Sequence, residues 1–407
     1  MPDETAILKP YTSNVFFAKT FDILPSFQDK VQCSILFNPK HSNYINAIQK
    51  AEKWRYGISE FMFWNSLETS NICASIKNTF AFFDKPLSQE EAEYPLAYGM
   101  LVYKDIRQIT YMLSAFYQPQ NAYCIGIDGN AKIDFQERLK IFGKCFSNIH
   151  VFVGPNVTYG GPEIPIIVLS CLQKLNERKH PWKYYQYLSG ADLPLKTNLE
   201  MAGIPPMPIW KSSLSSTFSR ASANIISKDP KVYELIQFLL KTGCPDESLW
   251  ATIAGNPEYI QMPGGFSAAE MFAKIKLDSS DSKKLSIPPK IRPSNSFPIY
   301  SYYISRYQVW DGINEWGLQN ECLGTWSHLS CIYGIGDLPT LLLRPELVAH
   351  KFYLDKHPAA FFCLYKKIRE RALDLINQQK FNASTYEQLP QIQLLRGKSI
   401  DNVKFFF

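Results

Sequence analysis

The chain has 407 residues, of which 46% are hydrophobic and 20% are charged. This composition supplies enough apolar side chain for a sizeable core and excludes an intrinsically disordered protein. The length suits about two or three ordinary domains, or one large α/β domain with additions. The net charge of +6 favours an anionic partner, but no run of five or more basic residues occurs, which argues against nucleic acid.

From about residue 90, short apolar segments alternate with amphipathic ones. The pattern predicts strands at 97–103, 122–127, 149–153 and 184–188, and helices between them at 106–117, 133–146 and 164–177. Strands that alternate with helices predict a mostly parallel sheet covered on both faces. Such sheets bind ligands at the carboxyl ends of their strands, where Asp128 and the turn at 189–192 are expected.

The regular alternation ends after residue 198. A proline-rich stretch follows at 205–208, a helix is predicted to begin at Pro245, and an irregular segment is predicted at 278–298. Two further helices are predicted at 341–352 and 359–375. We expect an irregular N-terminal region at 1–90, a main domain at 91–375 and a weakly ordered C-terminal tail at 376–407.

Nine cysteines are spread along the chain, and none lies in a Cys-x-x-Cys pair, which argues against a zinc ribbon. An odd number leaves at least one thiol free if the others pair within the chain. Glycosylation sequons at Asn156 and Asn382, together with the cysteines, favour a secretory compartment. The N-terminus shows no apolar signal segment, so the chain is either cytosolic or lacks an anchor that precedes this sequence.

Two motifs have a structural and a functional interpretation. Asp246 and Glu247 fall in the first turn of the helix predicted from Pro245. The helix dipole favours acidic side chains there, but Glu247 would also suit a general base. The turn at 189–192 either only reverses the chain or presents a carboxylate and backbone amides to a ligand.

Several common catalytic and cofactor motifs do not occur in the sequence. The segment 333–338 (YGIGDL) lacks the third glycine of a dinucleotide fingerprint and suits a turn, so a nicotinamide site is not expected. There is no P-loop, HExxH motif, Ser-His-Asp elbow or Asp-x-Asp sequence. Lys351 follows a predicted helix, and a solvated lysine is its default interpretation.

Taken together, these segments resemble the family 14 glycosyltransferases, the core-2 and I-branching β1,6-N-acetylglucosaminyltransferases. The resemblance runs over about residues 90–375 and is carried by EEAEYPLAYGMLVYKD, YQPQNAYCIGID, CFSNIHVF, WKYYQYLSGADLPLKTNLE, CPDESLWATI, CIYGIGDL and the pair Lys351 and Phe352. It implies a GT-A-like, Rossmann-type nucleotide-sugar fold in the catalytic domain at 91–375, preceded by a disulfide-linked stem. Members of the family are Golgi type II membrane proteins with an N-terminal anchor, and no anchor is visible in this sequence.

The resemblance also implies the site residues. Glu247 matches the catalytic base, which also contacts the acceptor, and Tyr307 matches an acceptor-binding aromatic residue. The implied nucleotide-sugar site consists of Leu101, Val102, Tyr103, Asp128, Gly129, Asn130, Tyr159, His328 and Lys351. In it, Asp128 to Asn130 would hold uridine and ribose, and Lys351 the diphosphate.

Three departures from the family pattern affect these expectations. His328 stands where the family often has a diphosphate-binding arginine. Val309 stands where a second acceptor aromatic is expected, and the acceptor-binding stretch after residue 200 is short. The identities of the acceptor and of the donor sugar are therefore the least determined part of the site.

The family's disulfide pattern implies four bridges with Cys244 free. The implied pairs are Cys33–Cys363, Cys73–Cys145, Cys124–Cys171 and Cys322–Cys331. Spacing alone does not choose among the possible pairings.

The resemblance implies an inverting glycosyltransferase, and the lack of an Asp-x-Asp sequence predicts that it needs no divalent metal. It would move N-acetylglucosamine from UDP-N-acetylglucosamine to an O-glycan of a glycoprotein in β1,6 linkage, in the Golgi lumen. Its membrane contact would be only through an N-terminal anchor. The alternatives are another UDP-sugar donor, such as glucose or xylose, or an inactive glycan-binding member of the family.

Overall fold

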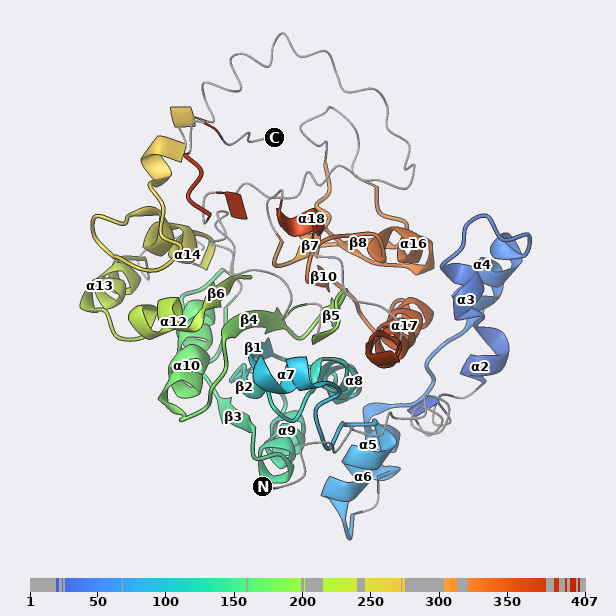
Figure 1. Cartoon of the computed structure of the whole chain (residues 1–407). Helices are drawn as coiled ribbons and strands as arrows, with labels where there is room; N and C mark the ends of the chain where they lie inside the picture. Colours follow the sequence, from blue (N-terminus) through green and yellow to red (C-terminus); the bar gives the residue numbers. More distant parts are fainter. Residues whose placement is uncertain are drawn as a thin grey trace, which may run out of the picture.

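A computed structural model describes residues 20–21, 24, 26–67, 69–158, 160–198, 201, 215–239, 246–271, 273–274, 304–312, 321–377, 384–387, 392–393, 396–399 and 402. Its centre is a five-stranded sheet with the strand order β3-β2-β1-β4-β6 (Figure 1). The strands are β1 (Leu96–Val102), β2 (Ala122–Ile127), β3 (Ile149–Val153), β4 (Tyr184–Ser189) and β6 (Thr217–Ser219). Only β6 runs antiparallel to its neighbour, so the expected mostly parallel sheet is confirmed.

Both faces of this sheet are buried, because alternate side chains of the apolar strands enter two separate cores. On β1, Tyr98 and Met100 enter one core, and Ala97 enters the other. The first core is covered by α8 (Ile106–Phe116) and α9 (Ile133–Cys145), and the second by α10 (Glu163–Glu177) and α12 (Arg220–Ile226). The four predicted strands and the three helices between them are confirmed to within about one or two residues at each end.

The strand order places a topological switch at β1. β1 pairs with β2 on one side and with β4 on the other, both in parallel. The connections after β1 and after β3 therefore leave in opposite directions, which opens the sheet edge at the carboxyl ends of β1 and β4. This edge is where an α/β sheet binds ligands, and it is where the Asp128 segment and the turn at 189–192 lie.

A second sheet, with the order β5-β10-β7, continues from this edge. It consists of β5 (Asp192–Pro194), β10 (Val348–His350) and β7 (Tyr307–Gln308), and beside it lies a hairpin of β8 (Thr325–Ser327) and β9 (Ser330–Ile332). The turn expected at 333–338 is confirmed as a 3-10 turn, Ile335–Asp337.

The predicted helix at 341–352 is wrong. The helix α16 (Leu338–Leu341) stops early, and Val348–His350 form a strand that pairs with β5 and β7. Pro345 has no N–H to donate and clashes with the preceding turn, so a helix cannot run through it. Lys351 therefore follows a strand and not a helix.

Two of the remaining predicted helices are confirmed, and two of the predicted irregular stretches lie outside the described residues. The helix predicted from Pro245 is α14 (Asp246–Gly255), and the helix predicted at 359–375 is α17 (Pro358–Asn377). The stretches at 205–208 and 278–298 lie outside the described residues. The structure also contains α13 (Pro230–Leu239) and α18 (Ser384–Glu387).

Among the described helices, none combines the length and apolar character needed to cross a membrane.

The N-terminal region consists of short helices, and its first part packs against α17 (Figure 1). Phe27 and Trp54 both contact Phe362 of α17 edge to face, with ring centroids 5.7 and 5.9 Å apart. Residues of this region share one core with the central sheet. The helices are α2 (Phe27–Lys30), α3 (Cys33–Leu36), α4 (Tyr44–Lys53), α5 (Glu60–Asn65), α6 (Ile72–Thr79) and α7 (Gln89–Glu93).

Four disulfide bonds connect these parts. The pairs are Cys33–Cys363, Cys73–Cys145, Cys124–Cys171 and Cys322–Cys331, the same four that the family resemblance implies. Cys244 lies outside the described residues. The first bond joins residues 330 positions apart and fastens the N-terminal helices to α17.

Replacing Cys33 and Cys363 together by serine should lower the free energy of unfolding by about 6 kcal/mol in the chain-entropy model, because cross-linking so long a loop removes much chain entropy from the unfolded state. Replacing Cys322 and Cys331, which are 9 positions apart, should cost less. Denaturant unfolding of both variants measures the difference. A non-reducing peptide map in which Cys33 is joined to any other cysteine would contradict the pairing.

Candidate active site

The carboxyl end of β2 is organised by the side chain of Asp128. Its Oδ1 accepts hydrogen bonds from the backbone N–H groups of Asn130, at 2.8 Å, and Val157, at 3.0 Å. The backbone N–H of Asp128 donates to the carbonyl of Val102, at 3.0 Å. One buried carboxylate thus fixes the ends of β1 and β2 against the segment that follows β3. Its Oδ2 makes no hydrogen bond to the described residues and remains able to accept one from a ligand.

Gly129 is required by the closeness of two backbone segments. A Cβ at this position would lie 2.4 Å from Oδ1 of Asn156 and 2.9 Å from the carbonyl of Gly154. Gly129 donates to the carbonyl of Pro155, at 3.0 Å, and Asn130 Nδ2 donates to the carbonyl of Val157, also at 3.0 Å. Residues 128–130 and 154–157 therefore form one rigid unit. Of the two sequons, Asn156 lies exposed in this unit, and Asn382 lies outside the described residues.

The end of β1 contributes mainly backbone to the site. The carbonyl of Leu101 accepts from Gly190, at 3.1 Å, and the side chain of Val102 points into the core. Tyr103 is the first exposed residue, with 51% of its surface accessible. The structure thus brings Leu101, Val102 and Tyr103 next to Asp128, whereas Tyr159 lies outside the described residues.

The turn after β4 is held by a buried carboxylate. Asp192 is fully buried, and its Oδ2 accepts from the backbone N–H of Ser189, at 2.8 Å. Its Oδ1 accepts from the Ser189 hydroxyl, at 3.1 Å, and lies 2.7 Å from Nδ1 of His350. Although burial opposes its charge, the bonds to His350 and the positive charge of Arg306 hold the pKa of Asp192 below its usual value. Asp192 therefore anchors β5 to β10 and is not turned toward solvent.

Lys351 emerges from the end of β10 into this region. It is only 5% exposed, and its Nζ donates to the carbonyl of Ser327 in the hairpin, at 2.7 Å. Burial and the nearby charge of Lys104 lower the pKa of Lys351. A buried ammonium group of this kind is costly unless an anion shares the site.

His328 lies next to the residue that holds Lys351. His328 and Leu329 both have positive φ, 50° and 59°, as the two central residues of a tight hairpin turn require. The turn leaves His328 exposed, and its Nδ1 lies 3.1 Å from the Ser327 hydroxyl. The structure therefore brings Lys351 and His328 together across the Ser327 backbone.

Gln108 is a residue of the site region that the sequence analysis does not identify. Its side chain is 4% exposed and makes three hydrogen bonds. Its Nε2 donates to the carbonyls of Gly190, at 3.0 Å, and Phe352, at 2.7 Å, and its Oε1 accepts from the N–H of Leu354, at 2.8 Å. One amide of α8 therefore fixes the turn after β4 and the segment after Lys351 relative to β1. A single glutamine in a helix gives no sequence signal of such a role.

The acids of α14 differ in their surroundings. Glu247 is exposed, whereas Asp246 is half-buried and its Oδ1 has no hydrogen-bond partner. Burial raises the pKa of Asp246, and the charge of Glu247 adds to the effect. The positive charge of Arg306 acts on Asp246 and also on Asp192 and His350. The start of α14 thus lies within electrostatic reach of the second sheet.

Tyr307 is packed into the second sheet. Its ring stacks on Tyr333, with centroids 5.8 Å apart, and the Arg344 guanidinium lies 4.2 Å from its centroid. Burial raises the pKa of Tyr307. Its implied contact with an acceptor stays a prediction, and Val309 is half-buried nearby.

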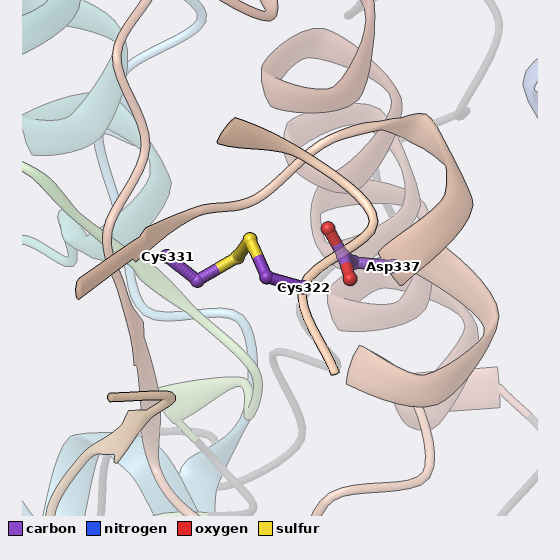
Figure 2. A group of neighbouring side chains, drawn as sticks. All are labelled: Cys322, Cys331 and Asp337. Carbon is purple, nitrogen blue, oxygen red and sulfur yellow. A yellow bond between two sulfur atoms is a disulfide. The ribbon is translucent and has the colours of Figure 1, made fainter. Parts of the chain in front are cut away.

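One cluster in the described residues has side chains of the types that bind metals: Cys322, Cys331 and Asp337 (Figure 2). The two sulfur atoms are bonded to each other, so neither offers the thiolate that a metal needs. The Asp337 carboxylate accepts from the N–H groups of Leu323, at 3.0 Å, and Gly334, at 2.8 Å. The cluster is a structural brace for the hairpin and does not fit a metal site.

Comparison with known proteins gives consistent matches. Residues 96–205 match the model of the Core-2/I-Branching enzyme family. The human beta-1,3-galactosyl-O-glycosyl-glycoprotein beta-1,6-N-acetylglucosaminyltransferase is 27% identical over 351 residues, which cover 75% of this chain and 76% of that protein. The mouse N-acetyllactosaminide beta-1,6-N-acetylglucosaminyl-transferase is 26% identical over 370 residues, 78% of this chain and 84% of the relative. A bovine herpesvirus 4 protein with the same name as the human one is 26% identical over 363 residues.

Replacing Gln108 by leucine should loosen the segment after Lys351, because the N–H of Leu354 loses its acceptor and two carbonyls lose their donor. We expect a loss of stability on the order of 3 kcal/mol and faster hydrogen exchange in peptides covering residues 351–354. The control is Asn121→Leu, which removes a buried amide that accepts from Leu96 at the amino end of β1. It should cost similar stability without affecting exchange at 351–354. Equal exchange in the two variants would show that Gln108 does not hold this segment.

Proposed function

We propose that this chain, whose matches are to the core-2/I-branching enzymes, is a glycosyltransferase that moves N-acetylglucosamine from UDP-N-acetylglucosamine to a hydroxyl of an O-glycan, forming a β1,6 branch. The observation that carries the proposal is the convergence at one sheet edge of the rigid Asp128 unit, the exposed Tyr103 and the buried Lys351. This combination suits a ligand with a base and ribose at one end and a diphosphate at the other.

In the proposed site the uridine would lie against the Asp128 unit. Asp128 Oδ2 is able to accept a hydrogen bond from a ribose hydroxyl or a uracil N–H, because Oδ1 already has two backbone donors. Gly129 lets this segment pack closely against residues 154–157, which keeps Asp128 in place. The exposed ring of Tyr103 offers an apolar surface beside them.

Lys351 would stabilise the departing UDP. Negative charge grows on the β-phosphate as the bond to the sugar breaks, and a fixed cation in a desolvated place stabilises it most. The Lys351 ammonium is held by Ser327 and needs little reorganisation when the charge develops. His328, on the same hairpin, would add a hydrogen bond from its ring N–H.

Glu247 is the proposed general base. Its exposed position at the start of α14 would let it take the proton from the acceptor hydroxyl as that oxygen attacks the anomeric carbon. UDP would leave from the opposite face, so the α-linked donor would give a β-linked product. The proposed mechanism needs no divalent ion, because cationic side chains take the place of an ion held by an Asp-x-Asp sequence.

We also propose that the enzyme works in the Golgi lumen, attached through an N-terminal anchor. Four disulfide bonds support an oxidising compartment for the folded chain.

The function is tested with purified protein, UDP-N-acetylglucosamine, UDP-glucose and UDP-xylose, and a set of mucin-type acceptors, with products identified by mass spectrometry. We expect a β1,6-linked N-acetylglucosamine product that forms equally well in EDTA. Transfer from a different donor would replace the proposed sugar, and activity that disappears in EDTA and returns with manganese would overturn the metal-free mechanism. Sugar binding without transfer from any donor would favour the alternative of an inactive glycan-binding protein.

Glu247→Gln should lower kcat by about 10²- to 10⁴-fold and leave UDP binding nearly unchanged, because the amide keeps the size of the side chain but cannot accept a proton. Asp246→Asn is the matched control, since Asp246 is half-buried and should matter less for the chemical step. Steady-state kinetics and UDP titration measure both effects. Small, equal losses of kcat in the two variants would rule out Glu247 as the base.

A further inference from the structure

Two lysines from distant parts of the chain share one aromatic ring at the site. Lys104 follows the end of β1, and Lys351 follows the end of β10. Their Nζ atoms lie 5.1 and 5.4 Å from the ring centroid of Tyr353. The ring attracts both ammonium groups and partly offsets the repulsion between them.

Neither lysine forms an ion pair with a carboxylate among the described residues. Asp105, the acid next to Lys104 in the chain, is bound to Arg107 at 2.7 Å. Asp355 is close enough to raise the pKa of Tyr353, but it makes no salt bridge to either lysine within the described part of the chain. Burial lowers the pKa of Lys351, and the repulsion from the charge of Lys104 lowers it further. Two neighbouring cations without an acidic partner make a local positive potential that favours an anion.

The two lysines lie on the side of the site where the diphosphate of the proposed UDP-sugar would bind. Lys104 comes directly after Tyr103, at the end of the strand whose Val102 carbonyl binds the N–H of Asp128. Lys351 lies beyond the turn after β4, which Gln108 connects to the Lys351 segment. Both lysines therefore lie at the same edge of the sheet as the Asp128 unit, which is proposed to hold the nucleoside.

We infer that Lys104 is a second diphosphate-binding residue, which acts with Lys351 on the phosphates of the UDP-sugar. This inference rests on the proposed function. It explains how the site would hold a diphosphate although a histidine, His328, stands where the family often has arginine. The exposed Lys104 would close onto the phosphates, while the buried Lys351 is already in place.

The test is calorimetric titration of wild type and Lys104→Gln with UDP and with uridine. We expect UDP affinity to fall about tenfold, as for the loss of one charge-assisted contact, and uridine affinity to stay the same. The dependence of UDP affinity on salt should also weaken. Lys104→Arg should restore most of the affinity, since it keeps the charge.

The matched control is Lys183→Gln. Lys183 is an exposed lysine that precedes β4 and so lies at the opposite edge of the sheet. It removes the same charge and should leave UDP affinity unchanged. Thermal unfolding checks that all variants fold.

The outcomes separate this inference from the proposed function. Wild-type protein that binds UDP, with Lys104→Gln binding it equally well, overturns the role of Lys104 and leaves the proposed function standing. Equal losses in Lys104→Gln and Lys183→Gln also overturn it, because they would show only an effect of net charge. Wild-type protein that does not bind UDP contradicts the proposed function, and the inference with it.

Discussion

The parallel pairing of β1 with β2 on one side and with β4 on the other determines where functional residues can lie in this chain. Parallel strands end at the same edge, and the change of direction at β1 keeps the helices from covering that edge. The segments after β1, β2 and β4 therefore meet there. Each is then fixed by one or two hydrogen bonds that cross between strands, such as those from Asp128 to Val102 and from Gly190 to Leu101.

Two buried charged groups at this edge, Asp192 and Lys351, differ in whether the protein compensates their charge. Asp192 is fully buried, but it accepts from Ser189 and lies beside His350, so its charge is compensated within the protein. Lys351 is buried, its hydrogen-bond partner among the described residues is one carbonyl oxygen, and it has a second lysine nearby. The first arrangement stabilises the fold, whereas the second leaves the site short of negative charge. That difference is why we interpret Asp192 as structural and Lys351 as a ligand-binding residue.

The strands and helices between residues 96 and 189 could be predicted because their apolar side chains repeat with the period of each element. The end of β2 at Asp128 followed from the same pattern. Strand β10 could not be predicted in this way, because its three residues are stabilised by pairing with β5 and β7, far away in the sequence. The local apolar pattern there favoured a helix, and only Pro345 argued against it.

Whether a residue of the candidate site could be found from the sequence also depended on whether its role rests on local pattern or on contacts between distant segments. The cysteine pairs and the proposed roles of Glu247 and Lys351 depend on contacts between distant segments, so they came from the family resemblance and not from spacing. Gln108 could not be found, because nothing in the sequence near α8 shows which carbonyls its amide will meet. Lys104 had the appearance of any surface lysine until Tyr353 and Lys351 were placed beside it.

The two acids at the start of α14 show how burial separates chemically similar groups. Asp246 is half-buried, and this burial, together with the charge of Glu247, raises its pKa, while Arg306 attracts its charged form. That attraction ties α14 to the second sheet, because Arg306 also acts on Asp192 and His350. Glu247 is exposed one residue later. It can meet an incoming hydroxyl without losing a partner within the described residues, while its neighbour keeps the helix in position. The proposed base therefore stands on a helix, whereas the proposed diphosphate-binding Lys351 follows a strand of the second sheet.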